Sequence, residues 1–197
     1  MTTDHCLVQG KRNVELERGE PEVVLETERL VLRRFQPDDL DDLASLYADP
    51  QVMRFWPRPM TREETQEWLN RAPAYYAKHG IGMWATLRKP ELRFVGRCGL
   101  MRKNIAGISE YEVGYMIAAA EWGQGLAPEA ARAIISFAFE RFGPPRVIAL
   151  IRPENLPSRR VAEKLGLRRV GELLHADLPH DLFAVNREEW RPEMRNG

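Results

Sequence analysis

Residues 121–128 read Glu121-Trp122-Gly123-Gln124-Gly125-Leu126-Ala127-Pro128, and this segment is the most informative in the chain. It lies between an apolar run that ends near Ile117 and a helical pattern that continues to Phe142. A strand, a glycine-rich turn and a helix N-terminus in this order direct backbone N–H groups and the positive end of a helix dipole at one place, where a pyrophosphate can bind. The same order also occurs in ordinary tight turns, so the segment alone leaves both interpretations open.

Hydrophobic periodicity and turn signals predict the elements on either side of this segment. Downstream, the pattern predicts a helix over 128–142, a strand over 147–151, a short helix over 158–165 and strands over 167–172 and 182–186. Upstream, it predicts a strand over 27–35, a helix from 37 that ends before 49, a helix that begins after 61 and ends by 82, and strands over 83–87, 94–100 and 111–117, the last two separated by a polar stretch over 102–110. This order predicts a mixed α/β fold in which helices cover a central sheet.

Length and composition limit the possible classes of protein. The 197 residues suit one domain, which we expect over 23–197 behind a polar N-terminal extension over 1–22. Basic and acidic residues both number 29, so the net charge attracts neither nucleic acid nor an acidic membrane surface. The first 20 residues lack the pattern of a signal peptide, and no apolar run approaches the ~20 residues of a membrane span. With only Cys6 and Cys98, a disulfide framework is not expected, and we predict a cytoplasmic protein.

Several groups of residues resemble the motifs of a known family in order and spacing. They are Thr27-Glu28-Arg29-Leu30 with Leu32-Arg33, Glu112-Val113-Gly114-Tyr115, Trp122-Gly123-Gln124-Gly125 with Ala127 and Glu129-Ala130-Ala131, Asn155 with Ser158 and Glu163-Lys164-Leu165-Gly166, and Asn186-Arg187-Glu188-Glu189-Trp190. Over about 25–190 the sequence resembles the GNAT superfamily of acetyltransferases, in particular the branch of ribosomal-protein N-terminal alanine acetyltransferases. The resemblance implies a mostly antiparallel central sheet, flanked by helices, with acetyl-CoA in a cleft between splayed middle strands.

The resemblance also implies which residues bind acetyl-CoA. The pyrophosphate is expected on the segment Trp122, Gly123, Gln124, Gly125, Leu126 and Ala127, and the pantetheine arm on Asn155 and Ser158. A strand N–H near Met116 or Ile117 would stabilise the oxyanion. Pro128 departs from the Thr usual in this branch and has no N–H to donate, although proline suits the first turn of a helix. The alternative for Asn155 is a helix N-cap, although one amide side chain can accept and donate and so serve both purposes.

Acetyl transfer requires an uncharged amine, and therefore a base, together with an acid for the leaving sulfur. Glu112 is the candidate base. Because side chains alternate along a strand and its neighbours do not show which face is inward, a solvated carboxylate remains an equal alternative. By resemblance Ser158 is the candidate acid, since the position where many family members have a tyrosine is Ala162 here. The alternative for Ser158 is a solvent-facing hydroxyl in a first helical turn.

Aromatic residues of the first half of the chain could form an acceptor pocket. We expect Trp56, Tyr76 and Trp84 to contribute to it, and Trp56, which lies among prolines, is the candidate for an exposed position. His175, Asp177, His180 and Asp181 match no common zinc spacing, and no metal is assigned.

The sequence thus predicts transfer of an acetyl group from acetyl-CoA to an amine, by direct attack in a ternary complex. A protein N-terminus and a small amine remain equal possibilities for the acceptor. The alternative function is an acetyl-CoA-binding sensor or assembly subunit without significant turnover, and a nucleotide-binding regulator is a weaker third. Several members of the branch are dimers, so the resemblance leaves a homodimer open.

Overall fold

The computed structural model describes residues 22–192. Eight strands form one sheet in the order β1-β2-β3-β4-β5-β6-β8-β7. Their bounds are β1 Val23–Glu26, β2 Leu30–Arg33, β3 Met83–Arg88, β4 Arg93–Ile105, β5 Ile108–Ile117, β6 Arg146–Ile151, β7 Arg168–His175 and β8 Leu178–Asn186. The α-helices are α1 Leu40–Ala48, α2 Arg62–His79, α3 Leu126–Phe142 and α4 Leu156–Lys164. The predicted mixed α/β fold with a mostly antiparallel sheet is confirmed.

Two of the predicted elements differ from the observed ones. The strand expected over 27–35 is present but shorter, as β2, and it pairs with β1, which was not predicted and precedes it in a hairpin. The chain turns between the two strands, where the Thr27 N–H donates to the Leu30 carbonyl. The polar stretch expected over 102–110 is not a loop, since β4 and β5 continue through it and meet at a tight turn. Ala106 and Gly107 form this turn with φ of 50° and 86°. Of the predicted N-terminal extension, residues 1–21 lie outside the described part of the chain.

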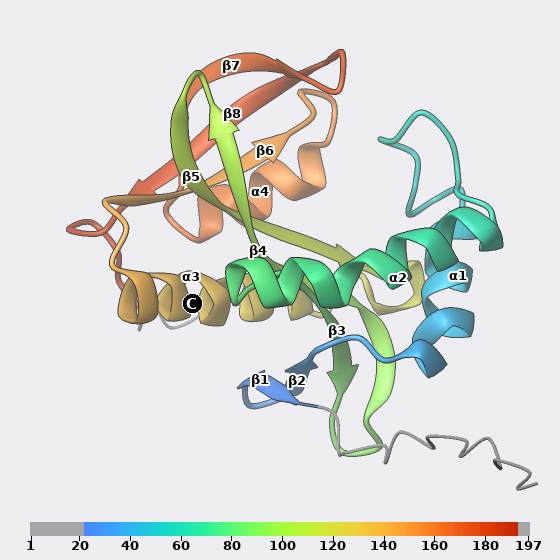
Figure 1. The fold of residues 1–197 in the computed structure, drawn as a ribbon. Helices are drawn as coiled ribbons and strands as arrows, with labels where there is room; N and C mark the ends of the chain where they lie inside the picture. The colour runs from blue at the N-terminus through green and yellow to red at the C-terminus, as the bar shows by residue number, and fades with distance from the viewer. Residues whose placement is uncertain (1–21, 193–197) are drawn as a thin grey trace, which may run out of the picture.

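The two faces of the sheet are covered by different helices, as Figure 1 shows with α2 in front of the strands and α3 behind them. The α3 helix buries an apolar stripe that includes Ala131, Ile134 and Ile135 against one face. On the other face a smaller cluster joins Leu43 and Leu46 of α1 to Leu69 of α2. The predicted capping box at the start of α2 is confirmed, because Thr61 and Glu64 each accept the other's backbone N–H.

The sheet opens at its middle, between the parallel strands β5 and β6. These strands pair only at Tyr111↔Val147 and Glu112↔Ile148. Beyond Glu112, β5 stays paired with β4 as far as Ile117, whereas β6 stays paired with β8. The described chain therefore has a gap between its two halves of sheet at the C-terminal ends of β5 and β6. None of the helices within residues 22–192 has the length and apolar character needed to span a bilayer.

Candidate functional site

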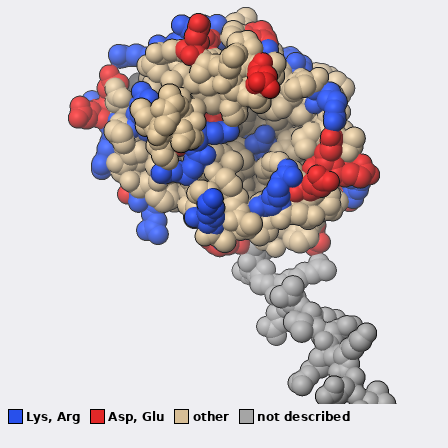
Figure 2. Space-filling view, turned by 45° about the horizontal axis from the view of Figure 1, so that its top comes forward, with Lys and Arg blue, Asp and Glu red and all other residues tan. Residues whose placement is uncertain are grey.

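A cavity of about 430 Å³ lies where β5 and β6 diverge. Its walls come from the end of β5, the glycine-rich segment before α3, the start of α4 and the segment between α1 and α2. The residues that line it include Val52, Phe55, Trp56, Tyr115, Met116, Ile117, Glu121, Trp122, Gly123, Gly125, Leu126, Ala127, Pro128, Asn155 and Ser158. Figure 2 shows a hollow on the face turned forward, with Lys and Arg side chains around it. The cavity therefore joins segments far apart in sequence, including most of the predicted cofactor-binding residues.

The glycine-rich segment has the backbone geometry of an anion-binding turn. Gly123 and Gly125 have φ of 78° and 76°, in the left-handed region that glycine adopts without a Cβ penalty. Gly125 is the N-cap of α3, so the N–H groups of Leu126 and Ala127 belong to the first helical turn, where helices leave N–H groups unpaired. Pro128 follows as the third helical residue and contributes no N–H. These N–H groups and the helix dipole suit a phosphate group at the cavity wall.

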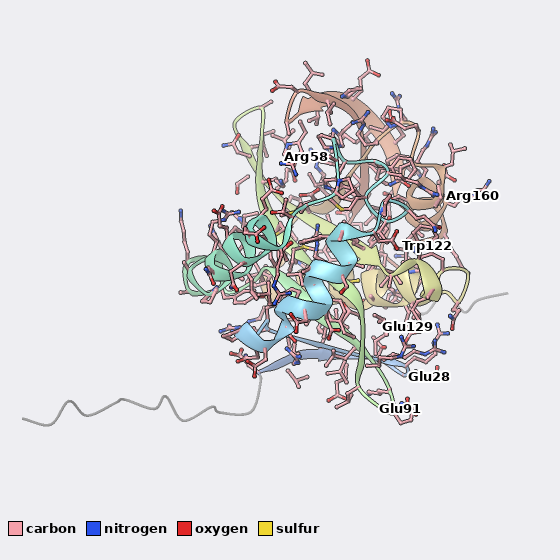
Figure 3. All side chains as sticks on the ribbon, turned by 90° about the vertical axis from the view of Figure 1, so that its right-hand side faces the viewer. Glu28, Arg58, Glu91, Trp122, Glu129 and Arg160 are labelled. Atoms are coloured by element: carbon pink, nitrogen blue, oxygen red, sulfur yellow. The ribbon has the colours of Figure 1, made fainter. Side chains whose placement is uncertain are left out.

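Two interactions hold this segment in place. The indole N–H of Trp122 donates to the Ile117 carbonyl over 2.8 Å, which ties the turn to the end of β5. Arg29 donates through Nη1 to the Gln124 carbonyl at 2.8 Å and through Nε to Oε2 of Glu129 at 2.6 Å. Figure 3 shows Trp122 and Glu129 on the side of the molecule where α3 begins. The conformation of the turn thus depends on the β1–β2 hairpin as well as on its own glycines.

The carboxylate of Glu129 is at the centre of that arrangement. Its Oε1 accepts from Thr27 Oγ1 at 2.6 Å and from the Arg29 N–H at 3.0 Å. Burial opposes ionisation of Glu129, but these hydrogen bonds and the Arg29 guanidinium hold its pKa below the usual value. The two motifs Thr27-Glu28-Arg29 and Glu129-Ala130-Ala131 are therefore a single structural unit, which spacing along the sequence did not indicate.

Gln124 is the member of the predicted phosphate turn whose side chain the structure directs elsewhere. Its Oε1 accepts from Arg88 Nη1 at 2.6 Å, and its Nε2 donates to Glu121 at 3.3 Å. Glu121 lines the cavity, and ion pairs with Arg93 and Arg88 lower its pKa. Gln124 does not line the cavity, and its side chain is bonded to Arg88 and Glu121. The expected contribution of Gln124 through its backbone amide stays a prediction.

Asn155 and Ser158 begin α4 at the opposite wall of the cavity. Asn155 is the N-cap, since its Oδ1 accepts the Ser158 N–H at 3.1 Å. That interaction leaves the Nδ2 group as the polar end available to the cavity. Ser158 Oγ donates to the Tyr115 hydroxyl at 3.1 Å, and this hydroxyl donates to the Ser158 carbonyl at 3.0 Å.

The Tyr115 hydroxyl is a site group that sequence analysis missed. It was visible only as part of the Glu112-Val113-Gly114-Tyr115 motif, and no local signal links it to α4. Burial raises its pKa, so the phenol stays protonated over the whole neutral and mildly alkaline range. The structure thus brings two hydroxyl groups to the place where sequence analysis expected one.

Glu112 lies on the same face of β5 as Met116, with Gly114 between them. It faces inward, with an exposed side-chain fraction of 16%. Its Oε2 is 3.6 Å from Lys103 Nζ of β4, and burial raises its pKa although the positive charges of Lys103 and Arg97 oppose that shift. Glu112 does not line the cavity itself. It lies on β5 four residues before Met116, which does line the cavity. A partly buried carboxylate with a raised pKa has the properties of a general base.

The predicted aromatic residues separate into two groups. Trp56 lines the cavity and is 42% exposed. Tyr76 and Trp84 are 4% and 1% exposed and do not line the cavity. Tyr76 donates to the Met83 carbonyl at 2.5 Å, and Trp84 packs edge-on against Phe137 of α3. We therefore correct the expectation for Tyr76 and Trp84, whose rings are part of the core.

The other predicted residues with possible metal-binding groups are distributed over the β7–β8 hairpin. His175 and His180 have ring centroids 5.5 Å apart, whereas Asp181 is paired with Arg169 at 2.6 Å. Within residues 22–192 no three His, Cys, Asp or Glu side chains are grouped as metal ligands.

A splayed, mostly antiparallel sheet with a glycine-rich helix N-terminus at the splay is an α/β arrangement suited to a phosphate-bearing ligand between the strands. Comparison with known proteins gives the family. Residues 29–168 match the model of the acetyltransferase (GNAT) domain, so the chain belongs to the GNAT acetyltransferase family and is an acyltransferase. The GNAT resemblance is confirmed, and the family uses acetyl-CoA.

Individual relatives agree with this assignment. The chain is 36% identical to the uncharacterized protein YkkB of Bacillus subtilis over 73% of this chain and 84% of that one. It is 30% identical to the uncharacterized N-acetyltransferase YnaD of the same organism over 74% of this chain and 82% of that one. A solved GNAT-family acetyltransferase from Bacillus anthracis superposes with a TM-score of 0.71 at 28% identity, covering 83% of this chain and 98% of that chain.

Proposed function

We propose that this acetyltransferase binds acetyl-CoA in the cavity between β5 and β6 and transfers the acetyl group to an amine that approaches from the Glu112 side. The observation that carries the proposal is the convergence on one cavity of a helix N-terminus with two positive-φ glycines and, opposite it, the paired hydroxyls of Ser158 and Tyr115. An electrophilic thioester is the chemistry that acetyl-CoA supplies when bound.

The residues present fit this ligand. The N–H groups of Leu126 and Ala127 suit the pyrophosphate, and no atom lies within 4 Å of where a Cβ of Gly123 would be, so the turn is open to a ligand. The Nδ2 group of Asn155, which the helix cap leaves available, suits an amide of the pantetheine arm. The backbone N–H of Met116 or Ile117 is the proposed donor to the oxyanion.

Two proton transfers are needed, and Glu112 acts as the base in one while Ser158 acts as the acid in the other. Glu112 accepts a proton from the attacking amine, directly or through one water, while the nitrogen forms a bond to the acetyl carbon. The C–S bond then breaks with its electron pair on sulfur. The Ser158 hydroxyl rotates from Tyr115 toward that sulfur and donates its proton, and the serine oxygen regains a proton from solvent as the products leave. Tyr115, held by its hydrogen bonds to Ser158, keeps the serine hydroxyl in position at the cavity. Both reactants are bound at once, so no acetylated residue of the chain is required.

The test is calorimetric titration with acetyl-CoA together with thiol release against a panel of amines and N-terminal peptides. We expect binding of acetyl-CoA and thiol release with one class of acceptor. Binding without release for any amine would favour the sensor function instead. Failure to bind acetyl-CoA, or tighter binding of ATP than of CoA, would overturn the proposal.

A further inference from the structure

A cationic side chain without a carboxylate partner lies beside the proposed path of the acceptor. Arg97 of β4 pairs with Met116 of β5 in the antiparallel register, and Met116 lines the cavity. Directly opposite residues of neighbouring strands project on the same face of the sheet. Arg97 therefore projects on the face that also carries Glu112, next to the cavity wall.

Aromatic rings hold the Arg97 guanidinium in place. Its Cζ lies 5.3 Å from the ring centroid of Tyr47 in α1 and 5.7 Å from that of Trp68 in α2. These two helices flank the segment that contributes Val52, Phe55 and Trp56 to the cavity. The Arg97 side chain thus connects the sheet with the helices at the acceptor side of the site. Its contacts with the two rings hold it there without an ion pair to an acidic residue.

The hydrogen-bonding capacity around Arg97 is incomplete. Its Nε is buried without a hydrogen-bond partner. The hydroxyl of Tyr47, which is 1% exposed, lies against the guanidinium, and Arg97 opposes the rise in the Tyr47 pKa that burial causes. No carboxylate within residues 22–192 forms an ion pair with Arg97. Leaving a buried polar group without a partner is costly, and more so when the group is charged, so such a group in a native protein calls for a partner that is absent here.

The charges near Glu112 favour an anion as that partner. Arg97 and Lys103 lie on the same face of β4, and both act on the carboxylate of Glu112. Glu110, the other acidic residue on this face of β5, is already paired with Arg146 at 2.5 Å. The face that carries the proposed base therefore has more positive than negative charge available to a ligand, which disfavours a polycationic acceptor.

We propose that Arg97 binds a carboxylate of the acceptor, and that the acceptor is consequently a compound whose reactive amine lies a few bonds from a carboxylate. A free amino acid and a peptide with an acidic first residue both have this chemistry, whereas aminoglycosides and polyamines do not. Arg97 would bind the carboxylate through its guanidinium, a favourable geometry for such a pair. This inference rests on the proposed amine acetylation and makes its substrate class specific.

The experiment compares acceptors that differ only in that carboxylate. A free amino acid is paired with its carboxamide, and a peptide that begins with Asp is paired with one that begins with Asn. In the unaltered protein we expect kcat/KM to be at least about tenfold higher for the carboxylate member of one pair, since a charged hydrogen bond contributes roughly 1.5–3 kcal/mol. The pair that shows the difference identifies the source of the carboxylate.

Arg97→Met should bring that ratio close to one, mainly by raising KM for the carboxylate member, and should leave the acetyl-CoA affinity unchanged. Because the Arg97 charge also favours ionisation of Glu112, the two members of a pair are compared at a pH well above the acidic decline in activity, where this shared effect is small. Arg102→Met is the matched control, because Arg102 lies on the opposite face of β4 over the Tyr111 ring, at 4.3 Å from its centroid. Arg97→Lys, which keeps the charge, should retain part of the preference if Arg97→Met fails to fold.

Two results would overturn the inference. One is a ratio near one for both pairs in the unaltered protein, and the other is an equal loss for both members of a pair in Arg97→Met. Efficient acetylation of an aminoglycoside or polyamine with no carboxylate preference would refute the role of Arg97 and leave amine acetylation intact. Absence of acetylation with every amine would instead refute the proposed function.

Discussion

The hydroxyl oxygens of Tyr115 and Ser158 lie 3.1 Å apart, although the two residues are 43 positions apart in the chain. Tyr115 comes from β5 and Ser158 from the first turn of α4, so this pair joins the two walls of the cavity. If Ser158 protonates the leaving sulfur and Tyr115 positions it, the two hydroxyls should contribute unequally to turnover.

We expect Ser158→Ala to lower kcat by about 100-fold, since a general acid typically contributes 10²–10⁴-fold. Tyr115→Phe keeps the ring and removes one hydrogen-bonding partner, so its kcat should fall by only about tenfold, with about 1 kcal/mol lost from the free energy of unfolding. Steady-state kinetics and acetyl-CoA titration of both variants would check this. Loss of acetyl-CoA affinity in parallel with kcat would show that Ser158 binds the ligand and does not supply the proton.

The pH dependence of kcat/KM should reflect the ionisation of Glu112, which the nearby charge of Lys103 influences. Glu112 must be ionised to act as a base, and burial raises its pKa, so activity should decline at a pH above the usual glutamate value of about 4.3 as the solution is acidified. Lys103→Met removes a charge that favours ionisation and should move this decline to higher pH. Lys89→Met, which removes the partner of Glu26 in the β1–β2 hairpin, should leave it in place.

The raised pKa of Glu112 also predicts how its replacement affects stability, and this distinguishes a catalytic base from a carboxylate that stabilises the fold. A carboxyl group whose pKa is higher in the folded than in the unfolded state favours folding most when it is protonated, and this contribution is lost as the pH rises through the folded-state pKa. Glu112→Gln should therefore lose activity without losing stability at pH 7. Urea denaturation at pH 7 would check this, and a substantial drop in stability would argue that Glu112 is retained for folding.

Glu129→Gln should weaken both the fold and acetyl-CoA binding. The variant loses charged hydrogen bonds to Thr27 and Arg29, at a cost of about 2 kcal/mol. It also frees Arg29, whose Nη1 holds the Gln124 carbonyl in the phosphate turn. Because the pKa of Glu129 is lowered in the folded protein, its contribution to stability is present above about pH 4.3 and declines as the pH falls.

Denaturation and acetyl-CoA titration together would check this prediction. Glu163→Gln is a suitable control, since Glu163 is an exposed residue of α4. An unchanged acetyl-CoA affinity in Glu129→Gln would mean that the phosphate turn holds its conformation without the β1–β2 hairpin.

Two glycines in the middle of the sheet should differ sharply in their tolerance of a methyl group. A Cβ on Gly99 would lie 2.1 Å from the Gly82 carbonyl oxygen, which is backbone and cannot move aside without disturbing the β3–β4 pairing. A Cβ on Gly114 would lie 3.3 Å from Cε of Met83, the end of a flexible side chain. Gly99→Ala should therefore cost about 3 kcal/mol or more and Gly114→Ala less than about 1.5 kcal/mol, measured by thermal or urea denaturation. Equal losses would contradict the assigned register.

Most helices and strands could be predicted from the sequence because the signals are local. The Thr61 and Glu64 capping box, the apolar period of α3 and the glycines before it all lie within one or two helical turns of the structure they specify. Where prediction failed, at the β1 strand over 23–26 and at 102–110, the local pattern was weak and strand pairing decided the result. Polar residues in β4 and β5 are tolerated because the long hairpin satisfies its backbone hydrogen bonds between the two strands.

The family, the glycine-rich turn at 122–127 and the residue types needed for acetyl transfer could all be recognised from sequence motifs. Which of those residues meet depends on how distant segments pack. The alternation of side chains along a strand left both faces of the sheet possible for Glu112, and packing places it on an inward face. Tyr76 and Trp84 are aromatic residues of a type that lines pockets, but both are buried in the core. Arg97 had no local signal at all. Its position depends on the register of β4 against β5 and on helices from elsewhere in the chain, and contacts between distant segments follow from burying a common core that no short stretch of sequence encodes.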